Sequence, residues 1–251
     1  MKGSNAVSPG RLAVGIHGAC GRMGTRIIQL LVADERLALA AALEHPLHAR
    51  SGEDAGAIAG VGALGIPVSV EPPPGARIDV MIDFSLPAGS LEIARRCAER
   101  GTPLVVGTTG FNPSERELLE SYQDRLALLI SPNMSKAVNL LARLVREAGR
   151  ALGGGCEVAI VERHHRTKKD APSGTALMLA RQVGHPVDMH ALRMGDCPGE
   201  HSVIFGLMGE TLELSHRAAN RDGFARGSLD AAAFLADKPP GLYTVDDWLG
   251  G

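Results

Sequence analysis

The sequence predicts an α/β protein, with a Rossmann-like, doubly wound parallel sheet followed by an α+β domain that has a mixed or antiparallel sheet. Three observations predict this fold. Short apolar runs alternate with helical patterns over about 130 residues. A glycine turn, GACGRMG at 18–24, joins the first run to the first helical pattern. Runs of alternating polarity at 202–207 and 211–215 then replace the β/α alternation.

The composition excludes several classes of protein. The chain has 251 residues, of which 45% are hydrophobic, and its 26 basic side chains face 28 acidic ones, as in an ordinary globular protein. The net charge of −2 gives no field that attracts nucleic acid or an anionic membrane surface. No run reaches the roughly 18 apolar residues of a membrane span. Residues 1–10 lack the apolar stretch of a signal peptide, and the four cysteines form no C-x-x-C pair, so we expect a cytoplasmic protein with reduced thiols.

The first elements are typical of a β-α-β unit. Residues 11–18 indicate a buried strand, 25–35 a helix, and 37–43 the next strand. In such a unit the helix presents free N–H groups at the glycine turn, where they bind a pyrophosphate. Glu44 ends the second strand at a position where a carboxylate accepts hydrogen bonds from an adenosine ribose, although a solvated strand end is the alternative. His45 beside it is compatible with a 2′-phosphate, so the choice between NADH and NADPH stays open.

The parallel sheet continues through two further strand and helix pairs and one more strand. The predicted strands are 78–85, 102–106 and 126–130, and the predicted helices are 87–101 and 112–125. The strand at 102–106 runs into GTTG, residues 107–110, and ligands bind at such strand ends in open α/β sheets.

The second part of the chain has a different pattern. Residues 137–152 form a long amphipathic helix that GGG at 153–155 ends, and a strand follows at 157–162. The runs at 202–207 and 211–215 flank a Met-Gly-Glu turn and indicate antiparallel strands.

A polar cluster, HHRTKKDAPSGTA at 164–176, carries the chemistry. His164 and Lys168 are candidates for general acids, and the Ser-Gly-Thr helix start offers N–H groups to a carboxylate, so the cluster predicts a site for a small anionic substrate. Three alternatives accompany this hypothesis. His164 and His165 are a metal-binding pair, for which spaced partners are lacking; Ser173 is only a helix cap; and Lys169 is only a solvated charge.

These motifs resemble the bacterial dihydrodipicolinate reductase family. GACGRMG, GTTG, SPNMS at 131–135 and above all ERHHRTKKDAPSGTA carry the resemblance, which extends to 199–227 and to GLYTVDD near the C-terminus. It implies an NAD(P)H-dependent oxidoreductase that reduces the dihydrodipicolinate-type substrate to tetrahydrodipicolinate in lysine biosynthesis, without a metal. It also implies a homotetramer.

The resemblance assigns roles to individual residues. His164 and Lys168 match catalytic positions. The positions that match or adjoin substrate contacts are His165, Ser173, Gly174 and Thr175. The cofactor stretches comprise Gly18, Ala19, Cys20, Gly21, Arg22, Met23, Glu44, His45, Gly107, Thr108, Thr109, Ser131, Pro132, Asn133 and Met134. We expect 1–132 and 221–251 to form the dinucleotide-binding domain and 133–220 the substrate-binding and oligomerisation domain.

Two departures from the family pattern matter. The connection at 177–189 is shorter than usual, which leaves the oligomeric state and one wall of the substrate site open. His45 stands where many relatives carry arginine, so we expect NADH to be used at least as well as NADPH. Two alternatives remain: a reductase of a related cyclic imine or amino acid, and a nucleotide-binding sensor without turnover.

Overall fold

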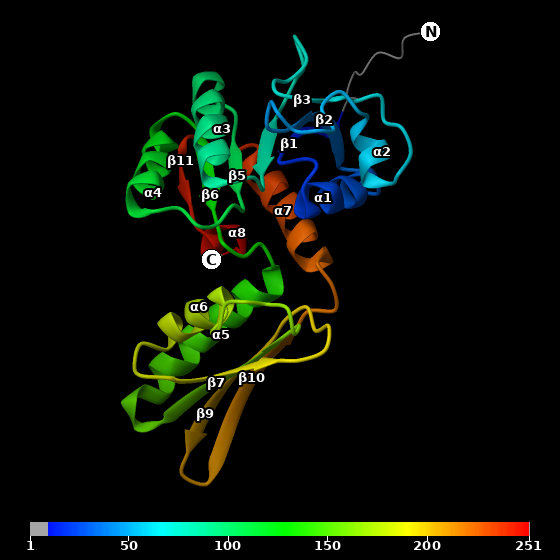
Figure 1. Cartoon of the computed structure of the whole chain (residues 1–251). Helices are drawn as coiled ribbons and strands as arrows, with labels where there is room; N and C mark the ends of the chain where they lie inside the picture. The colour runs from blue at the N-terminus through cyan, green and yellow to red at the C-terminus, as the bar shows by residue number, and fades with distance from the viewer. Residues whose placement is uncertain (1–9, 251) are drawn as a thin grey trace. The chain divides into compact units, whose positions relative to one another are not determined.

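The computed structural model describes residues 10–250, and the chain divides into two compact units (Figure 1). One unit extends to Met134 and resumes at Phe224, and the other comprises Ser135–Gly223. Segment 1–9, for which the sequence predicts no signal peptide, lies outside the described residues. Within residues 10–250 every helix is too short or too polar to span a bilayer.

The first unit contains a seven-stranded sheet in which every neighbouring pair is parallel. Its strands are β1 (Leu12–His17), β2 (Leu37–Leu43), β3 (Val68–Ser69), β4 (Val80–Asp83), β5 (Leu104–Val106), β6 (Ala127–Ile130) and β11 (Gly241–Tyr243). Their order is β11-β6-β5-β4-β1-β2-β3, so the chain first builds outward from β1 through β2 and then returns to add β4 on the other side. This order confirms the doubly wound sheet and places its switch point between β1 and β4.

Helices flank this sheet, and local sequence explains where they begin and end. They are α1 (Arg22–Val32), α2 (Ala55–Ala59), α3 (Pro87–Arg100), α4 (Pro113–Glu120), the 3₁₀ turn Ser121–Asp124, α7 (Asp222–Leu235) and α8 (Val245–Trp248). Asn112 and Glu115 form a capping box that starts α4. Pro87 opens α3, and Gly101, at φ +66°, ends it in the left-handed conformation that favours glycine.

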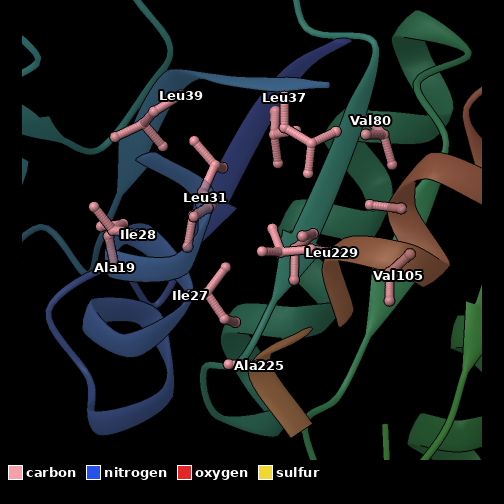
Figure 2. Packing of buried hydrophobic residues seen from close by; sticks show 14 of the residues in the cluster. Ala19, Ile27, Ile28, Leu31, Leu37, Leu39, Val80, Val105, Ala225 and Leu229 are labelled. Carbon is pink, nitrogen blue, oxygen red and sulfur yellow. The ribbon is translucent and has the colours of Figure 1, made fainter. Parts of the chain in front are cut away.

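The main core of the first unit joins segments that are far apart in the sequence. Ile27 and Leu31 of α1 and Leu229 of α7 belong to one buried cluster with Val80 and Val105 of the sheet (Figure 2). Because all five side chains are almost fully buried, α7 is an integral part of the first unit although it follows the second unit in the sequence.

The second unit is an α+β structure with a mixed sheet, as predicted. Its elements are α5 (Lys136–Leu152), the 3₁₀ turn Gly153–Gly155, β7 (Glu157–His164), α6 (Gly174–Val183), β8 (Asp188–Arg193), β9 (Glu200–Leu207) and β10 (Glu210–Arg217). The strand order is β10-β9-β7-β8, with β7 and β8 parallel and the other pairs antiparallel. Val145 of α5 and Leu179 of α6 pack with Ile160 and Phe205 in the core of this unit. Both helices cover the same face of the sheet (Figure 1).

Several strands differ in length from the sequence prediction, and two of these differences bear on the candidate site. Strand β4 covers only four residues of the predicted 78–85, because Ser85 leaves the ladder and its N–H donates to Thr108 Oγ1 at 2.9 Å. Strand β7 extends past Glu162 to His164, because β8, which the sequence analysis did not predict, pairs with it up to that residue. The extension fixes the position of the histidine pair.

Candidate active site

A cavity of about 700 Å³ opens in the first unit at the switch point of the sheet. Its wall includes five of the residues expected to contact cofactor, namely Gly18, Cys20, Gly21, Glu44 and His45. It also includes residues that the sequence analysis did not assign, among them His17, Phe84 and Ser85. The volume is that of an ordinary small-ligand site.

The glycine turn is packed too tightly for side chains at two of its positions. Gly18 has φ +77°, and a Cβ there would lie 2.5 Å from the carbonyl oxygen of Phe84. A Cβ on Gly24 would lie 2.2 Å from the carbonyl oxygen of Gly18. Because of these contacts the first turn of α1 lies directly against the loop, and the positive end of the helix dipole adjoins the cavity at Gly21.

Glu44 connects the end of β2 to the glycine turn. Its Oε2 accepts the N–H of Cys20 and its Oε1 accepts the N–H of His45, both at 3.0 Å. The half-buried carboxylate is therefore held by backbone amides and is not a freely solvated strand end. A carboxylate has about four lone-pair sites, so it retains capacity to accept hydrogen bonds from a ribose.

Asp83 is the centre of a buried hydrogen-bond network that the sequence analysis missed. This fully buried side chain at the end of β4 binds His17 Nδ1 at 2.7 Å and accepts from Ser85 Oγ at 2.6 Å and from Thr108 Oγ1 at 2.8 Å. The hydroxyl of Ser90 donates to it as well. The network fixes the ends of three parallel strands, and thus the floor of the cavity. Thr108 takes part with its side chain turned toward this carboxylate.

The other two predicted cofactor stretches end β5 and β6 on the same edge of the sheet, outside the wall of the cavity. In Gly107–Thr109, the first residue is glycine because the ring of Phe84 lies where a Cβ would be, 2.2 Å away. In Ser131–Met134, the Ser131 hydroxyl donates to the Asn133 carbonyl at 2.8 Å, and the side chain of Met134 is buried in the core. Thr109 and Pro132 are exposed.

In the second unit, β7 ends at His164, so His164 and His165 do not share a continuing strand. The chain turns at this point, and the N–H of Lys168 donates to the carbonyl of His165 at 3.1 Å. Lys168 Nζ donates to Asp170 Oδ1 at 2.7 Å, and His165 Nδ1 lies 2.8 Å from Thr167 Oγ1. The turn groups the candidate acids His164 and Lys168 within one short segment.

The start of α6 lies against the same segment. The hydroxyl of Ser173 accepts the N–H of Ala176 at 3.2 Å, so Ser173 is the helix cap. Gly174 and Thr175 form the first helical positions, and a Cβ on Gly174 would meet nothing within 4 Å. The first turn of α6 therefore presents a sterically open surface at the positive end of a helix.

Three polar residues that the sequence analysis did not assign lie beneath this site: Glu162 and His201 are buried, and Arg193 is partly buried. Glu162, which is 1% exposed, accepts from Arg193 Nη2 at 2.7 Å and from the N–H of Ser173 at 3.0 Å, and its other oxygen contacts His164 Nδ1. His201 Nε2 lies 3.2 Å from Ser173 Oγ, and its ring centroid is 5.1 Å from that of His164. The signal for Glu162 was its position in the sequence, since residues two apart on a strand share a face.

The electrostatics of this cluster follow from its burial. Desolvation opposes ionisation of Glu162, but the hydrogen bonds from Arg193 and Ser173 outweigh it and leave the pKa of the carboxyl below its ordinary value. Burial lowers the pKa of His164, although the Glu162 carboxylate acts in the opposite direction. Burial and the charge of His164 lower the pKa of His201 to about 4, so His201 is neutral at physiological pH.

Two groups among residues 10–250 have the ligand types and spacing of a metal site, with donor atoms within 4.8 Å of one another. The groups are Cys20, Glu44 and His48, and Glu162, His164 and His201. In the second group the guanidinium of Arg193, 2.7 Å from Glu162, places positive charge where a cation would bind. The absence of a metal from the reaction stays a prediction.

The first unit has the three features of the Rossmann-like, dinucleotide-binding class of protein. They are a parallel doubly wound sheet, a glycine turn at the start of the first helix, and a cavity at the switch point of the sheet. The model of the N-terminal domain of dihydrodipicolinate reductase matches residues 12–134, and that of the C-terminal domain matches 137–249. The chain belongs to the dihydrodipicolinate reductase family. The resemblance drawn from the sequence and the expectation of an oxidoreductase are confirmed.

Individual relatives agree with this assignment. The chain is 45% identical to a 4-hydroxy-tetrahydrodipicolinate reductase of Anaeromyxobacter sp., over 94% of this chain and 96% of the relative. It is 39% identical to one of Halorhodospira halophila, over 95% and 99%. A solved structure, dipicolinate-bound dihydrodipicolinate reductase from Paenisporosarcina sp. TG-14, superposes with a TM-score of 0.75 at 22% identity, over 93% of this chain and 97% of that one, which shows the shared fold.

Proposed function

We propose that this chain reduces 4-hydroxy-tetrahydrodipicolinate, or its dihydrodipicolinate form, to tetrahydrodipicolinate in the diaminopimelate route to lysine. The observation that carries the proposal is the joint match of both units to one reductase family. The second unit adds a chemical reason, because His164 and Lys168 adjoin a helix start suited to a carboxylate.

The substrate is a small dicarboxylate, and the residues of the second unit divide the tasks of binding and protonating it. The ammonium of Lys168, released from Asp170, attracts a carboxylate, and the amide end of α6 at Gly174 and Thr175 receives one. His165 lines the same turn. His164 gives a proton to the reduced ring system, with Lys168 as the second donor. A bound dianion favours the protonated imidazole, which offsets the effect of burial on the pKa of His164.

A nicotinamide dinucleotide supplies the hydride in this proposal. Gly18 to Met23 would receive its pyrophosphate, and Glu44 a ribose, while the ends of β5 and β6 would adjoin its nicotinamide end. The carboxylate of Glu44 repels a 2′-phosphate. The imidazole of His45 attracts a 2′-phosphate less strongly than the guanidinium of an arginine at that position would. We therefore expect NADH to support turnover at least as well as NADPH.

The domain organisation and assembly belong to the same proposal. We assign cofactor binding to 1–132 with 221–251, and substrate binding and assembly to 133–220. Met189, Leu192 and Leu212 on β8 and β10 are between 37% and 48% exposed, and such side chains favour association of copies through this sheet. A cytoplasmic homo-oligomer, a homotetramer by family resemblance, is expected. Light scattering that gives a monomer at micromolar concentration would contradict it.

The test is turnover of substrate generated freshly by the preceding synthase from pyruvate and aspartate semialdehyde, with NADH and NADPH in parallel. We expect consumption of reduced cofactor that persists in EDTA, and much slower consumption with an analogue that lacks one carboxylate. Equal rates with the analogue would favour a related imine as substrate. The shortened stretch 177–189, which is divided among α6, residues 184–187 and the start of β8, is the feature that keeps this alternative open. Cofactor binding without turnover of either compound would favour a sensor.

A further inference from the structure

The second unit contains one buried carboxylate that connects two parts of the proposed site. Three protein groups contact the Glu162 carboxylate, which has about four acceptor sites: Oε1 accepts from Arg193 and from the N–H of Ser173, and Oε2 contacts His164 Nδ1. Arg193 Nη2 also donates to the carbonyl of Asp170 at 2.6 Å. Glu162 therefore touches the candidate proton donor and the cap of the helix that would receive the substrate.

The contacts of His164 also define which of its nitrogens is accessible. Nδ1 faces Glu162, and Nε2 faces the backbone of Gly199, where a Cβ would lie only 3.0 Å away. Any side chain at position 199 would cover Nε2. A carboxylate at this place would stabilise a proton on Nδ1, which would leave Nε2 to exchange protons with a ligand.

We propose that Glu162 is a positioning residue that fixes the tautomer and orientation of His164 and, through Ser173, the start of α6. Arg193 keeps the carboxylate ionised and in place. The inference rests on the proposed function for its catalytic meaning, because His164 is there the proton donor. In this role the carboxylate itself touches neither substrate nor cofactor.

Several charged groups face His164 from the surrounding elements, and together they define what removal of Glu162 does. Glu162 lies on the same strand, Arg193 on β8, Lys168 in the turn and His201 on β9. Lys168 and Arg193 disfavour the imidazolium, and His201 is neutral. Glu162 is the anion that opposes burial and these cations, so its neutralisation leaves their effects uncompensated.

The test compares Glu162→Gln with Glu157→Gln, a control at the exposed start of the same strand. Glutamine keeps an oxygen that accepts from Ser173 and Arg193 but removes the charge beside His164. We expect the pKa of His164, followed by NMR, to fall by about one to three pH units. We expect kcat near neutral pH to fall by about 10- to 1000-fold, with partial recovery in acid, and KM to change little. Glu162→Asp restores part of the activity, and Glu157→Gln behaves as the unaltered protein.

Two outcomes overturn the inference. One is a folded Glu162→Gln protein in which the pKa of His164 and the pH profile are unchanged. The other needs no variant: ¹⁵N NMR of the unaltered protein that shows the neutral His164 ring protonated on Nε2 and bare on Nδ1. Both readouts are independent of turnover, so failure of the proposed reaction and failure of this inference are separate results.

Discussion

Gly24 gives a prediction whose magnitude follows from the geometry of the glycine turn. In Gly24→Ala the new methyl group would lie 2.2 Å from the carbonyl oxygen of Gly18 and 2.8 Å from Ala19 Cα. Both contacts are to backbone, which no change of rotamer can relieve. Ordinary contact begins at 3.4 Å, so the start of α1 has to move away from the loop by the difference between 3.4 and 2.2 Å, about 1.2 Å.

Such a displacement costs about 1 to 3 kcal/mol. If the same free energy is lost from binding of the pyrophosphate at the glycine turn, the affinity for NADH falls by about 5- to 150-fold. The assay is a fluorescence or calorimetric titration of NADH, paired with a thermal unfolding curve that shows the protein is folded at the assay temperature.

Gly154→Ala is the matched control, because a Cβ at that position meets nothing within 4 Å. We expect it to leave the affinity unchanged. Unaltered NADH affinity in a folded Gly24→Ala protein would refute the reasoning that close contact between α1 and the turn forms the binding site.

Three further predictions concern pH, stability and cofactor choice. The pKa of the buried His201 falls from 6.5 to about 4 on folding, so between these pH values the unfolded chain binds one proton more than the folded chain. The free energy of unfolding should therefore drop by about 3 kcal/mol as the pH falls from 6.5 to 4. In urea unfolding His201→Gln should flatten this drop, and an equally steep drop in the variant would contradict the assignment. Asp83→Asn should lower the free energy of unfolding of the first unit by about 3 kcal/mol in urea and weaken NADH binding. The exposed control Asp124→Asn should do neither. A fully stable Asp83→Asn protein would contradict the role of the Asp83 hydrogen-bond network. His45→Arg should lower the KM for NADPH relative to that for NADH, and an unchanged ratio in steady-state kinetics would show that His45 lies away from the 2′ position.

Much of the first unit was predictable because its signals are local. The apolar run at 37–43 matches β2 residue for residue, and Pro87 and Gly101 mark the ends of α3. The fold class followed from the order of such elements. Strand β8 was not predictable in this way, because five of its six residues are exposed and its pairing with β7 depends on tertiary contact.

The candidate site shows the same division. His164 and Lys168 stood out because histidines and cations are dense in one short segment. Asp83 and Glu162 did not, because each is one of two acidic residues in a predicted strand and nothing local distinguishes it. Partners that identify them in the structure, His17 for Asp83 and Arg193 for Glu162, lie 66 and 31 residues away in the sequence. Periodicity indicates that such a residue faces the interior, but only the fold shows whether a donor meets it there.

The most direct test of the proposed reaction is the rate of reduced-nicotinamide consumption with synthase-generated substrate in the unaltered chain, in His164→Ala and in Lys168→Ala. We expect turnover in the unaltered chain and a loss of at least about 10²-fold in each variant, with NADH binding to the first unit intact. Turnover that survives both substitutions would contradict the placement of proton donation at the end of β7 and in the turn that follows it.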